Sequence, residues 1–220
     1  MKSQQLNPTA KPKLRGVSHE IAAYFYTVAG VWLISQVWGQ SERVLAAIIY
    51  SLSVVALFGI SAFYHRPHWQ PKQRQLLRRF DHSAIYILIA GTMIPLAMLC
   101  LTGESRRNGL IAIGASCTLG IAKSLLWIRA PKWASALLFV TLAFAFSPFL
   151  PAVSATVGTR AVIIMWAGAV IYIVGAVTYV IKRPNPIPGV FGYHEVFHLL
   201  VVLAASLHFW MISSLIRGVW

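Results

Sequence analysis

The residues of this chain best suited to chemistry are two histidines, His194 and His198, near the start of its last long apolar stretch. Their spacing of four places both imidazoles on one face of a helix. Two neutral imidazoles on one face supply half of the ligands of a tetrahedral zinc ion. An ionisable residue within an apolar helix is costly unless a partner compensates it, so it predicts a functional site. The pair therefore indicates metal binding, and a wetted helix start is the alternative.

Three further polar residues stand at the ends of earlier apolar stretches. His65 ends the second stretch, Asp81 directly precedes the third, and Ser61 lies one helical turn before His65. If consecutive stretches cross a membrane in alternating directions, these ends and the start of the last stretch lie at the same face. We therefore expect His65, Asp81 and Ser61 to converge with His194 and His198 at one depth.

Three histidines with an open fourth position describe a catalytic zinc site rather than a structural one. Bound Zn²⁺ lowers the pKa of a water to roughly 7 and so supplies a nucleophile at neutral pH. Asp81 would be the general base or orienting acceptor for that water. Ser61 would donate to a developing oxyanion or to the same water. The alternatives are an interfacial position for His65 and a helix N-cap role for Asp81, but their joint occurrence favours the metal site.

Other ionisable residues leave more than one interpretation open. The run His194-Glu195-x-x-His matches a zinc-protease pattern in which the glutamate is the general base. Glu195 lies about 100° around the helix from His194, so it faces the site, a neighbouring helix or the lipid headgroups. His208 is predicted to be a buried, hydrogen-bonded core residue. His19 and Glu20 flank the first apolar stretch, and Glu20 is predicted to form a salt bridge with the basic loops.

The elements that position these residues are apolar helices. The chain has 220 residues, of which 58% are hydrophobic and 11% charged, against about 25% charged in a soluble domain. Runs near 20 apolar residues cross a bilayer as helices. We predict an all-α polytopic membrane protein, with a basic cytoplasmic tail at 1–18 and a single seven-helix domain at 19–220. The predicted crossings are 21–39, 44–65, 82–102, 109–128, 134–150, 160–181 and 194–216.

The distribution of charge predicts the orientation of the bundle. The formal net charge is +14, which by itself would suggest nucleic acid. However, 13 of the 19 lysines and arginines fall in the segments that would lie on one side, with the N-terminus. The positive-inside rule then predicts an integral inner-membrane protein with a cytoplasmic N-terminus and an outside C-terminus. The basic loops are expected to face anionic lipid headgroups, and no nucleic-acid partner is predicted.

Two connecting segments have distinct compositions. The segment 72–79 is basic with two leucines and is predicted to be a short amphipathic helix on the inner membrane surface. The segment 182–189 contains three alternating prolines and is predicted to be a stiff, extended connector.

These residues, taken together, resemble a known family. The runs that carry the resemblance are Ser61-Ala62-Phe63-Tyr64-His65, Arg78-Arg79-Phe80-Asp81-His82-Ser83-Ala84-Ile85-Tyr86, Ile89-Ala90-Gly91-Thr92 and Phe191-Gly192-Tyr193-His194-Glu195-Val196-Phe197-His198. They are similar to the hemolysin III family, the bacterial branch of the progestin and adipoQ receptor family. The resemblance covers about Glu20 to Leu215.

The resemblance implies zinc held by His65, His194 and His198, with Asp81 contacting a water at the zinc and Ser61 nearby. The related adiponectin receptors and alkaline ceramidases imply hydrolysis of a lipid amide or ester and a role in membrane lipid homeostasis. The family's hemolysin label implies a pore-forming, cytolytic protein as an alternative. A receptor or lipid-state sensor with a structural zinc is a second alternative. The substrate, the oligomeric state and catalysis itself stay open.

Overall fold

The computed structural model describes residues 11–127 and 130–220, which form seven α-helices and one short 3-10 helix. The described residues contain no β-strand, only an isolated antiparallel bridge between Ile187 and Phe191. The prediction of an all-helical protein is confirmed. The elements are α1 (Val17–Gln36), α2 (Ser41–His65), α3 (Pro71–Cys100), α4 (Gly103–Leu126), α5 (Lys132–Phe144), η1 (Ser147–Phe149), α6 (Leu150–Ile181) and α7 (Tyr193–Arg217).

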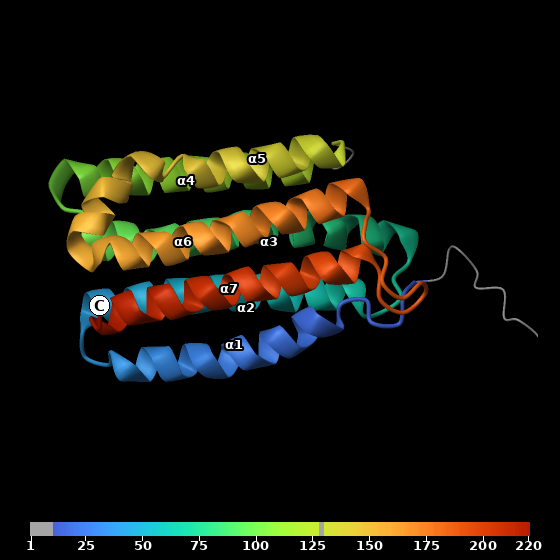
Figure 1. Cartoon of the computed structure of the whole chain (residues 1–220), viewed down its shortest axis with the longest axis horizontal. Helices are drawn as coiled ribbons and strands as arrows, with labels where there is room; N and C mark the ends of the chain where they lie inside the picture. The colour runs from blue at the N-terminus through green and yellow to red at the C-terminus, as the bar shows by residue number, and fades with distance from the viewer. Residues whose placement is uncertain (1–10, 128–129) are drawn as a thin grey trace, which may run out of the picture.

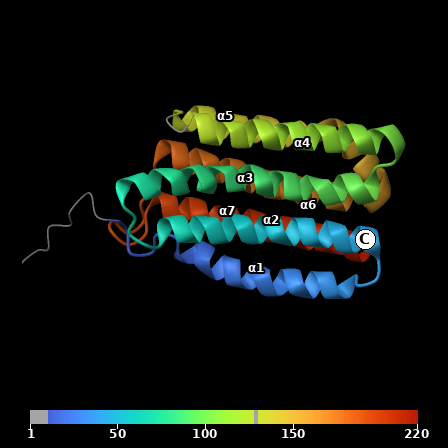
Figure 2. The same ribbon diagram turned by 180° about the vertical axis from the view of Figure 1, so that it is seen from behind.

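The helices form two antiparallel rows, seen from the two sides in Figures 1 and 2. One row consists of α5, α6 and α7, and the other of α4, α3 and α2, with contacts across the rows between α4 and α5, α3 and α6, and α2 and α7. Helix α1 closes the bundle by packing on both α2 and α7. The start of α1 and the C-terminus lie at opposite ends of the bundle (Figure 1). We call the end where α2 ends and α7 begins the histidine end.

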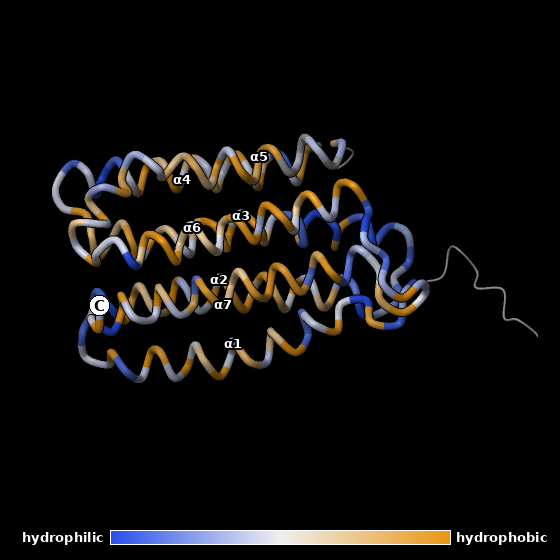
Figure 3. The backbone as a smooth tube through the Cα atoms, in the orientation of Figure 1, coloured by the Kyte–Doolittle hydropathy of each residue, from blue (hydrophilic) through white to orange (hydrophobic). Residues whose placement is uncertain are grey.

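Five helical stretches of the described residues are long and apolar enough to cross a membrane: Ser41–His65, Pro71–Cys100, Gly103–Leu126, Leu137–Ile181 and Tyr193–Arg217. Figure 3 shows the same division, with hydrophobic residues along the helices and hydrophilic ones concentrated in the connections at the histidine end. The chain is therefore an integral membrane protein. The count of seven crossings and the side of the N-terminus stay predictions.

Three elements differ in detail from their predicted form. The basic segment 72–79 is helical, but it is the first part of α3, which begins at Pro71 and continues without a break. The connector before α7 is not simply extended, because it folds back in a turn closed by hydrogen bonds between Ile187 and Phe191, with N···O distances of 2.9 and 2.8 Å. Helix α6 is kinked at Gly158, whose φ of 80° lies outside the helical region. The predicted sixth crossing, 160–181, begins just after this kink.

The core lies between the two rows and beneath α1. Its fully buried side chains include Tyr50, Phe58, Leu96, Ile212 and Ile216. Small residues let neighbouring helices approach closely, which is how helices associate within a bilayer. At Gly91 of α3, for example, an added Cβ would lie 2.0 Å from Ser53 Oγ of α2. Such contacts fix the depth of α2, α3 and α7 relative to one another, and thereby the depth of the polar residues that they carry.

Candidate metal centre

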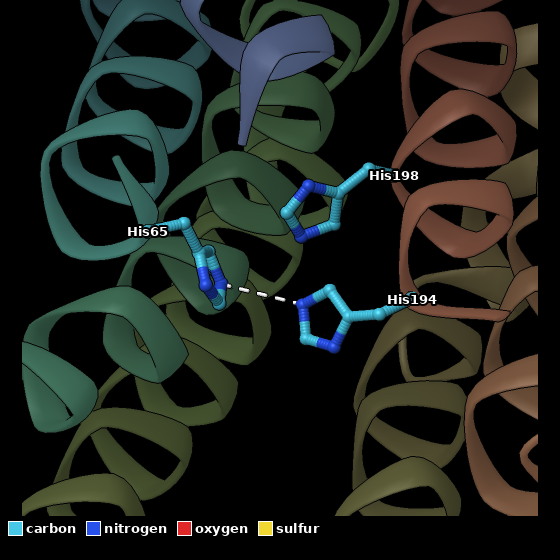
Figure 4. Close-up of side chains that lie close together, drawn as sticks. All are labelled: His65, His194 and His198. Atoms are coloured by element: carbon cyan, nitrogen blue, oxygen red, sulfur yellow. Dashed lines mark hydrogen bonds between the residues drawn. The ribbon is translucent and has the colours of Figure 1, made fainter. Parts of the chain in front are cut away.

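Three histidines from two helices converge at the histidine end. His65 is the last residue of α2, and His194 and His198 lie in the first two turns of α7. Each offers a ring nitrogen that lies within 4.8 Å of those of the other two, and Figure 4 shows the three rings around a common space. The Nε2 atoms of His65 and His194 are 3.4 Å apart. The structure thus brings together the three residues that the sequence assigned to a metal.

The spacing of two of these nitrogens fits a tetrahedral ion. Zinc–imidazole bonds measure about 2.0–2.1 Å, so two ligands on a tetrahedral zinc are separated by about 3.3–3.4 Å. The Nε2 atoms of His65 and His194 have this separation, 3.4 Å. Three imidazole donors that face one another also suit zinc chemically, because imidazole is a borderline ligand that this metal prefers. The donor set can therefore hold one metal ion.

Asp81 and Ser61 lie next to the three histidines. Asp81 Oδ2 is 3.9 Å from His65 Nε2, and the side chain of Asp81 is 15% exposed. The buried hydroxyl of Ser61 interacts with this carboxylate. Both residues are delivered by helices that pack closely, since α2 and α3 are neighbours along the chain and in space. The arrangement places one carboxylate and one hydroxyl beside the donor set.

Asp81 differs from the other carboxylates of the chain. Each of the four glutamates forms an ion pair with an arginine, whereas Asp81 has neither an arginine nor a lysine within 4.0 Å among the described residues. The four pairs are Glu20–Arg66, Glu42–Arg106, Glu104–Arg107 and Glu195–Arg15. The basic partner nearest to Asp81 is the imidazole of His65. Its oxygens are thus available to a water or a substrate at the site.

Glu195 does not join the histidine cluster, although it lies between two of its members in the sequence. Its side chain is 3% exposed and forms an ion pair with Arg15 through Oε1. The other oxygen, Oε2, accepts a hydrogen bond from the backbone N–H of Gly192 at 2.8 Å. Glu195 therefore stabilises the start of α7, where a negative charge also suits the helix dipole. The zinc-protease interpretation is not supported, because the carboxylate is engaged elsewhere.

Residues 11–16, which we call the N-terminal strap, lie across the histidine end. Backbone N–H groups of Lys13 and Leu14 donate to the carbonyl groups of residues 189 and 190, each at 3.2 Å. Lys11 Nζ donates to the carbonyl oxygen of Arg66 at 2.8 Å. Just after the strap, Glu20 Oε2 is 2.6 Å from Arg66 Nε. The predicted salt bridge between Glu20 and a basic loop is therefore confirmed.

His19 is a residue of this region that sequence reasoning missed. Its side chain is buried, and its ring stacks on that of His198 with centroids 3.8 Å apart and planes inclined by 9°. It belongs to the first turn of α1, near the beginning of the sequence, whereas His198 lies in α7, near the end. No spacing rule links residues 19 and 198, so nothing in the sequence pointed to this contact beyond the presence of a histidine at a helix start.

A long cavity of about 220 Å³ leads from the histidines into the bundle. Its polar end is lined by Ser61, Asp81 and the three clustered histidines. Its walls continue as far as Phe146 and Met165 with mainly apolar side chains, among which Thr92, Tyr172 and His208 are polar. The stretch of α3 that lines it, from Asp81 to Met93, corresponds to about 18 Å of helix. A molecule with a polar head and a long apolar chain matches this distribution.

The remaining histidines have other surroundings. His68 is exposed in the loop after α2, and His82 lines the cavity one residue after Asp81. His208 is buried and its Nε2 lies 3.0 Å from the carbonyl oxygen of Met165. The prediction of a buried, hydrogen-bonded core role for His208 is confirmed. These three stand outside the group whose nitrogens converge.

The fold and the site together define a class: an integral membrane bundle of helices with three converging histidines at one end of an apolar cavity. The model of the family described as "Haemolysin-III related" matches residues 8–209. The chain belongs to this family. It is similar to "Hemolysin-3" of Bacillus cereus, with 27% identity over 198 residues that cover 89% of this chain and 87% of the relative. The "Hemolysin-3 homolog" of Bacillus subtilis (strain 168) is 23% identical over 198 residues, with coverages of 89% and 90%.

Proposed function

We propose that the protein is a zinc-dependent hydrolase that cleaves a lipid amide or ester at the inner leaflet, and so acts in membrane lipid homeostasis. The observation that carries the proposal is the placement of three converging imidazoles and the Asp81 carboxylate, which has no lysine or arginine within 4.0 Å among the described residues, at the polar end of a long apolar cavity. A lipid's acyl chain would occupy the apolar part of the cavity. Its carbonyl group would then lie beside the histidines.

The residues divide the work of hydrolysis between them. His65, His194 and His198 would hold the ion. Zinc, when bound, supplies a Lewis acid that polarises a carbonyl group and makes water more acidic. Asp81 would orient the attacking water, take its proton as the water oxygen bonds to the carbonyl carbon, and return that proton to the leaving nitrogen or oxygen. Ser61 would steady the Asp81 carboxylate through the interaction that joins them.

A structural role for the metal is the second candidate. The three histidines come from α2 and α7, so an ion between them would link two helices that are far apart in the sequence. A ligand that binds only the folded state stabilises it by mass action. A receptor or lipid-state sensor would need the metal to link the two helices, but it would not need to catalyse a reaction. The two candidates differ in one measurable respect, because only a hydrolase needs Asp81.

The names of the two relatives raise a third candidate, a pore-forming hemolysin. A pore requires polar groups along its length, whereas here most of the ionisable side chains lie at the histidine end of the cavity, with Tyr172 and His208 further along it. Leakage of a dye from vesicles distinguishes this candidate. Equal leakage with the wild type and with His194→Ala/His198→Ala would assign pore formation to a part of the molecule that does not involve the metal.

The first test is the metal content of the detergent-purified protein. We expect about one zinc per chain in the wild type and its loss in His194→Ala/His198→Ala, while His68→Ala, which removes an exposed histidine, keeps the metal. Zinc-loaded protein is then assayed with a fluorogenic long-chain acyl amide and the matching ester. Wild-type protein without zinc after reloading would refute the metal site. Zinc-loaded protein that cleaves neither probe would leave the structural role as the better candidate.

A further inference from the structure

We propose that His19 is a positioning residue of the metal centre, which holds the ring of His198 in the orientation that a metal ligand needs. This inference rests on the metal binding proposed above. It goes beyond it, because His19 belongs neither to the His-x-x-x-His pattern of α7 nor to the cluster of three nitrogens. It assigns a function to the first turn of α1, which would otherwise be only a part of the packing.

The contact between the two rings is a buried parallel stack. His19 is 3% exposed and His198 is 1% exposed. Their rings lie nearly parallel, inclined by 9°, with centroids 3.8 Å apart. Because the flat ring of His19 lies against the flat ring of His198, it restricts rotation of the His198 imidazole about its Cβ–Cγ bond. The other ring neighbours of His198 are inclined to it, by 65° for His65, 63° for His194 and 56° for Phe197, so among the described residues only His19 stacks in parallel on it.

His198 lacks the support that metal-binding histidines usually have. Such a histidine generally donates its second ring N–H to a carboxylate, a carbonyl group or a water, and this bond fixes the orientation of the ring. In His198, Nδ1 is buried and has no hydrogen-bond partner among the described residues. Figure 4 shows the other ring nitrogen facing the space between His65 and His194. The face of His19 therefore takes over the orienting role that a hydrogen bond plays elsewhere.

The same geometry excludes His19 as a fourth ligand in this arrangement. The lone pair of an imidazole nitrogen lies in the plane of the ring, so His198 would offer its nitrogen to an ion within its own ring plane. The ring of His19 is parallel to that plane and displaced from it, and its own lone pairs point past such an ion. The donor set stays at three histidines with one open position, as in a catalytic zinc site.

His19 is itself held in place from two sides. Phe58 of α2 presents its edge to the His19 ring, with centroids 5.0 Å apart and planes at 80°. Gly16, just before α1, has a φ of 81°, and a Cβ added there would lie 2.8 Å from Cβ of His65. Glycine adopts this left-handed backbone conformation without the steric penalty that a side chain would bring. The conformation brings the chain from the N-terminal strap directly alongside His65, so that the first turn of α1 starts at a fixed position beside the ligands.

The test compares two substitutions in the full-length protein, His19→Ala and His19→Phe. Alanine removes the ring face, whereas phenylalanine keeps a flat ring and removes both nitrogens. The zinc affinity is measured by competition with a chromogenic chelator, and the coordination geometry by the visible absorption of the Co²⁺-loaded protein. Removing a residue that supports a metal ligand typically lowers metal affinity about 10–100-fold. We expect this loss and an altered Co²⁺ spectrum for His19→Ala, and near wild-type behaviour for His19→Phe.

Each outcome supports or contradicts the proposed positioning role of the His19 ring. Wild-type affinity and spectrum in His19→Ala would overturn the inference, and a loss as large in His19→Phe as in His19→Ala would assign the role to a ring nitrogen and overturn it as well. If His19→Ala does not fold, His19→Leu replaces it, because leucine keeps the volume without a flat face. His68→Ala is the matched control. A wild-type protein that binds neither metal refutes the proposed function itself, which is a different result from wild-type binding that His19 does not influence.

Discussion

The histidines of α2 and α7 fall into two groups, a cluster of three and the single residue His208, whose surroundings differ. At the histidine end, His65, His194 and His198 turn ring nitrogens toward one another, with a carboxylate 3.9 Å from one of them. Further along α7, His208 stands alone, with its Nε2 3.0 Å from the carbonyl oxygen of Met165 and its ring against Tyr172. A single imidazole whose ring N–H is hydrogen-bonded to a carbonyl group requires no metal ion to compensate its burial. Converging imidazoles turn three ring nitrogens toward the same space, where one cation could bind all of them.

The comparison shows that burial of a histidine within a membrane span is not by itself a sign of function. What distinguishes the two groups is the kind of partner that the ring nitrogens face, which in the cluster is one another. His208 finds its partner in a backbone carbonyl group and packs so closely on α6 that a Cβ added at Gly168 would lie 2.4 Å from its Nε2. The predictions below test this contrast, in order of decreasing effect.

The largest effect is expected at Asp81. Asp81→Asn keeps the shape of the side chain and removes the base. If Asp81 moves the proton during hydrolysis, turnover of an acyl amide should fall about 10²–10⁴-fold, the usual contribution of a general base. The zinc content should stay at the wild-type value, because the three histidines are unchanged. Turnover that persists in this variant would remove Asp81 from the chemistry and favour the structural role of the metal.

Glu195 is predicted to affect stability rather than chemistry. Glu195→Gln weakens the ion pair with Arg15 but can still accept the hydrogen bond from Gly192. We expect the free energy of unfolding to fall by about 1–3 kcal/mol, the cost of a weakened bond to a buried charged group. Metal content and turnover should stay within a few-fold of wild type. A collapse of turnover with zinc retained would revive the protease-like role for this glutamate.

The packing around His208 is tested by Gly168→Ala. The added methyl group would meet the imidazole at 2.4 Å, so either the ring or α6 must shift. Overpacking of this kind costs about 1–3 kcal/mol, and thermal unfolding in detergent should begin at a lower temperature. Gly114→Ala is the matched control, since a Cβ there meets nothing within 4 Å. Equal stability of the two variants would contradict the close packing described for His208.

The smallest effect is expected for His208→Leu. This change removes one hydrogen bond to the carbonyl group of Met165, which is worth about 0.5–1.5 kcal/mol. Elemental analysis should give the same zinc content as in the wild type. If zinc were lost together with His208, the two groups of histidines would not be independent, and the contrast drawn between them would fail.

Much of the candidate site could be predicted because it depends on local geometry. The spacing of His194 and His198 fixes their common face wherever α7 lies, since it follows from the helical repeat. The lengths of the apolar stretches indicated the helices, and alternation of direction along the chain brought His65 and Asp81 to the same end. The ion pair of Glu20 followed from the basic residues of the neighbouring loop, and the structure shows it with Arg66.

Other features depended on how separate helices meet. The sequence left Glu195 open among three directions, and only the position of the N-terminal strap selected Arg15 as its partner. It predicted a separate short helix at 72–79, whereas α3 runs through this segment from Pro71. The basic residues there made the segment look like a surface helix, and composition alone cannot tell where one helix ends and another begins.

The sequence by itself determined the helical class, the membrane character and the residues that can bind a metal, because each follows from composition or from the geometry of one helix. The tertiary structure decided which imidazoles meet, that Asp81 has His65 rather than an arginine as its ion-pair partner in the described part of the chain, and that His19 lies on His198. These depend on the distances and rotations between α1, α2, α3 and α7. Many small packing contacts set these quantities together, and no single stretch of the sequence encodes them.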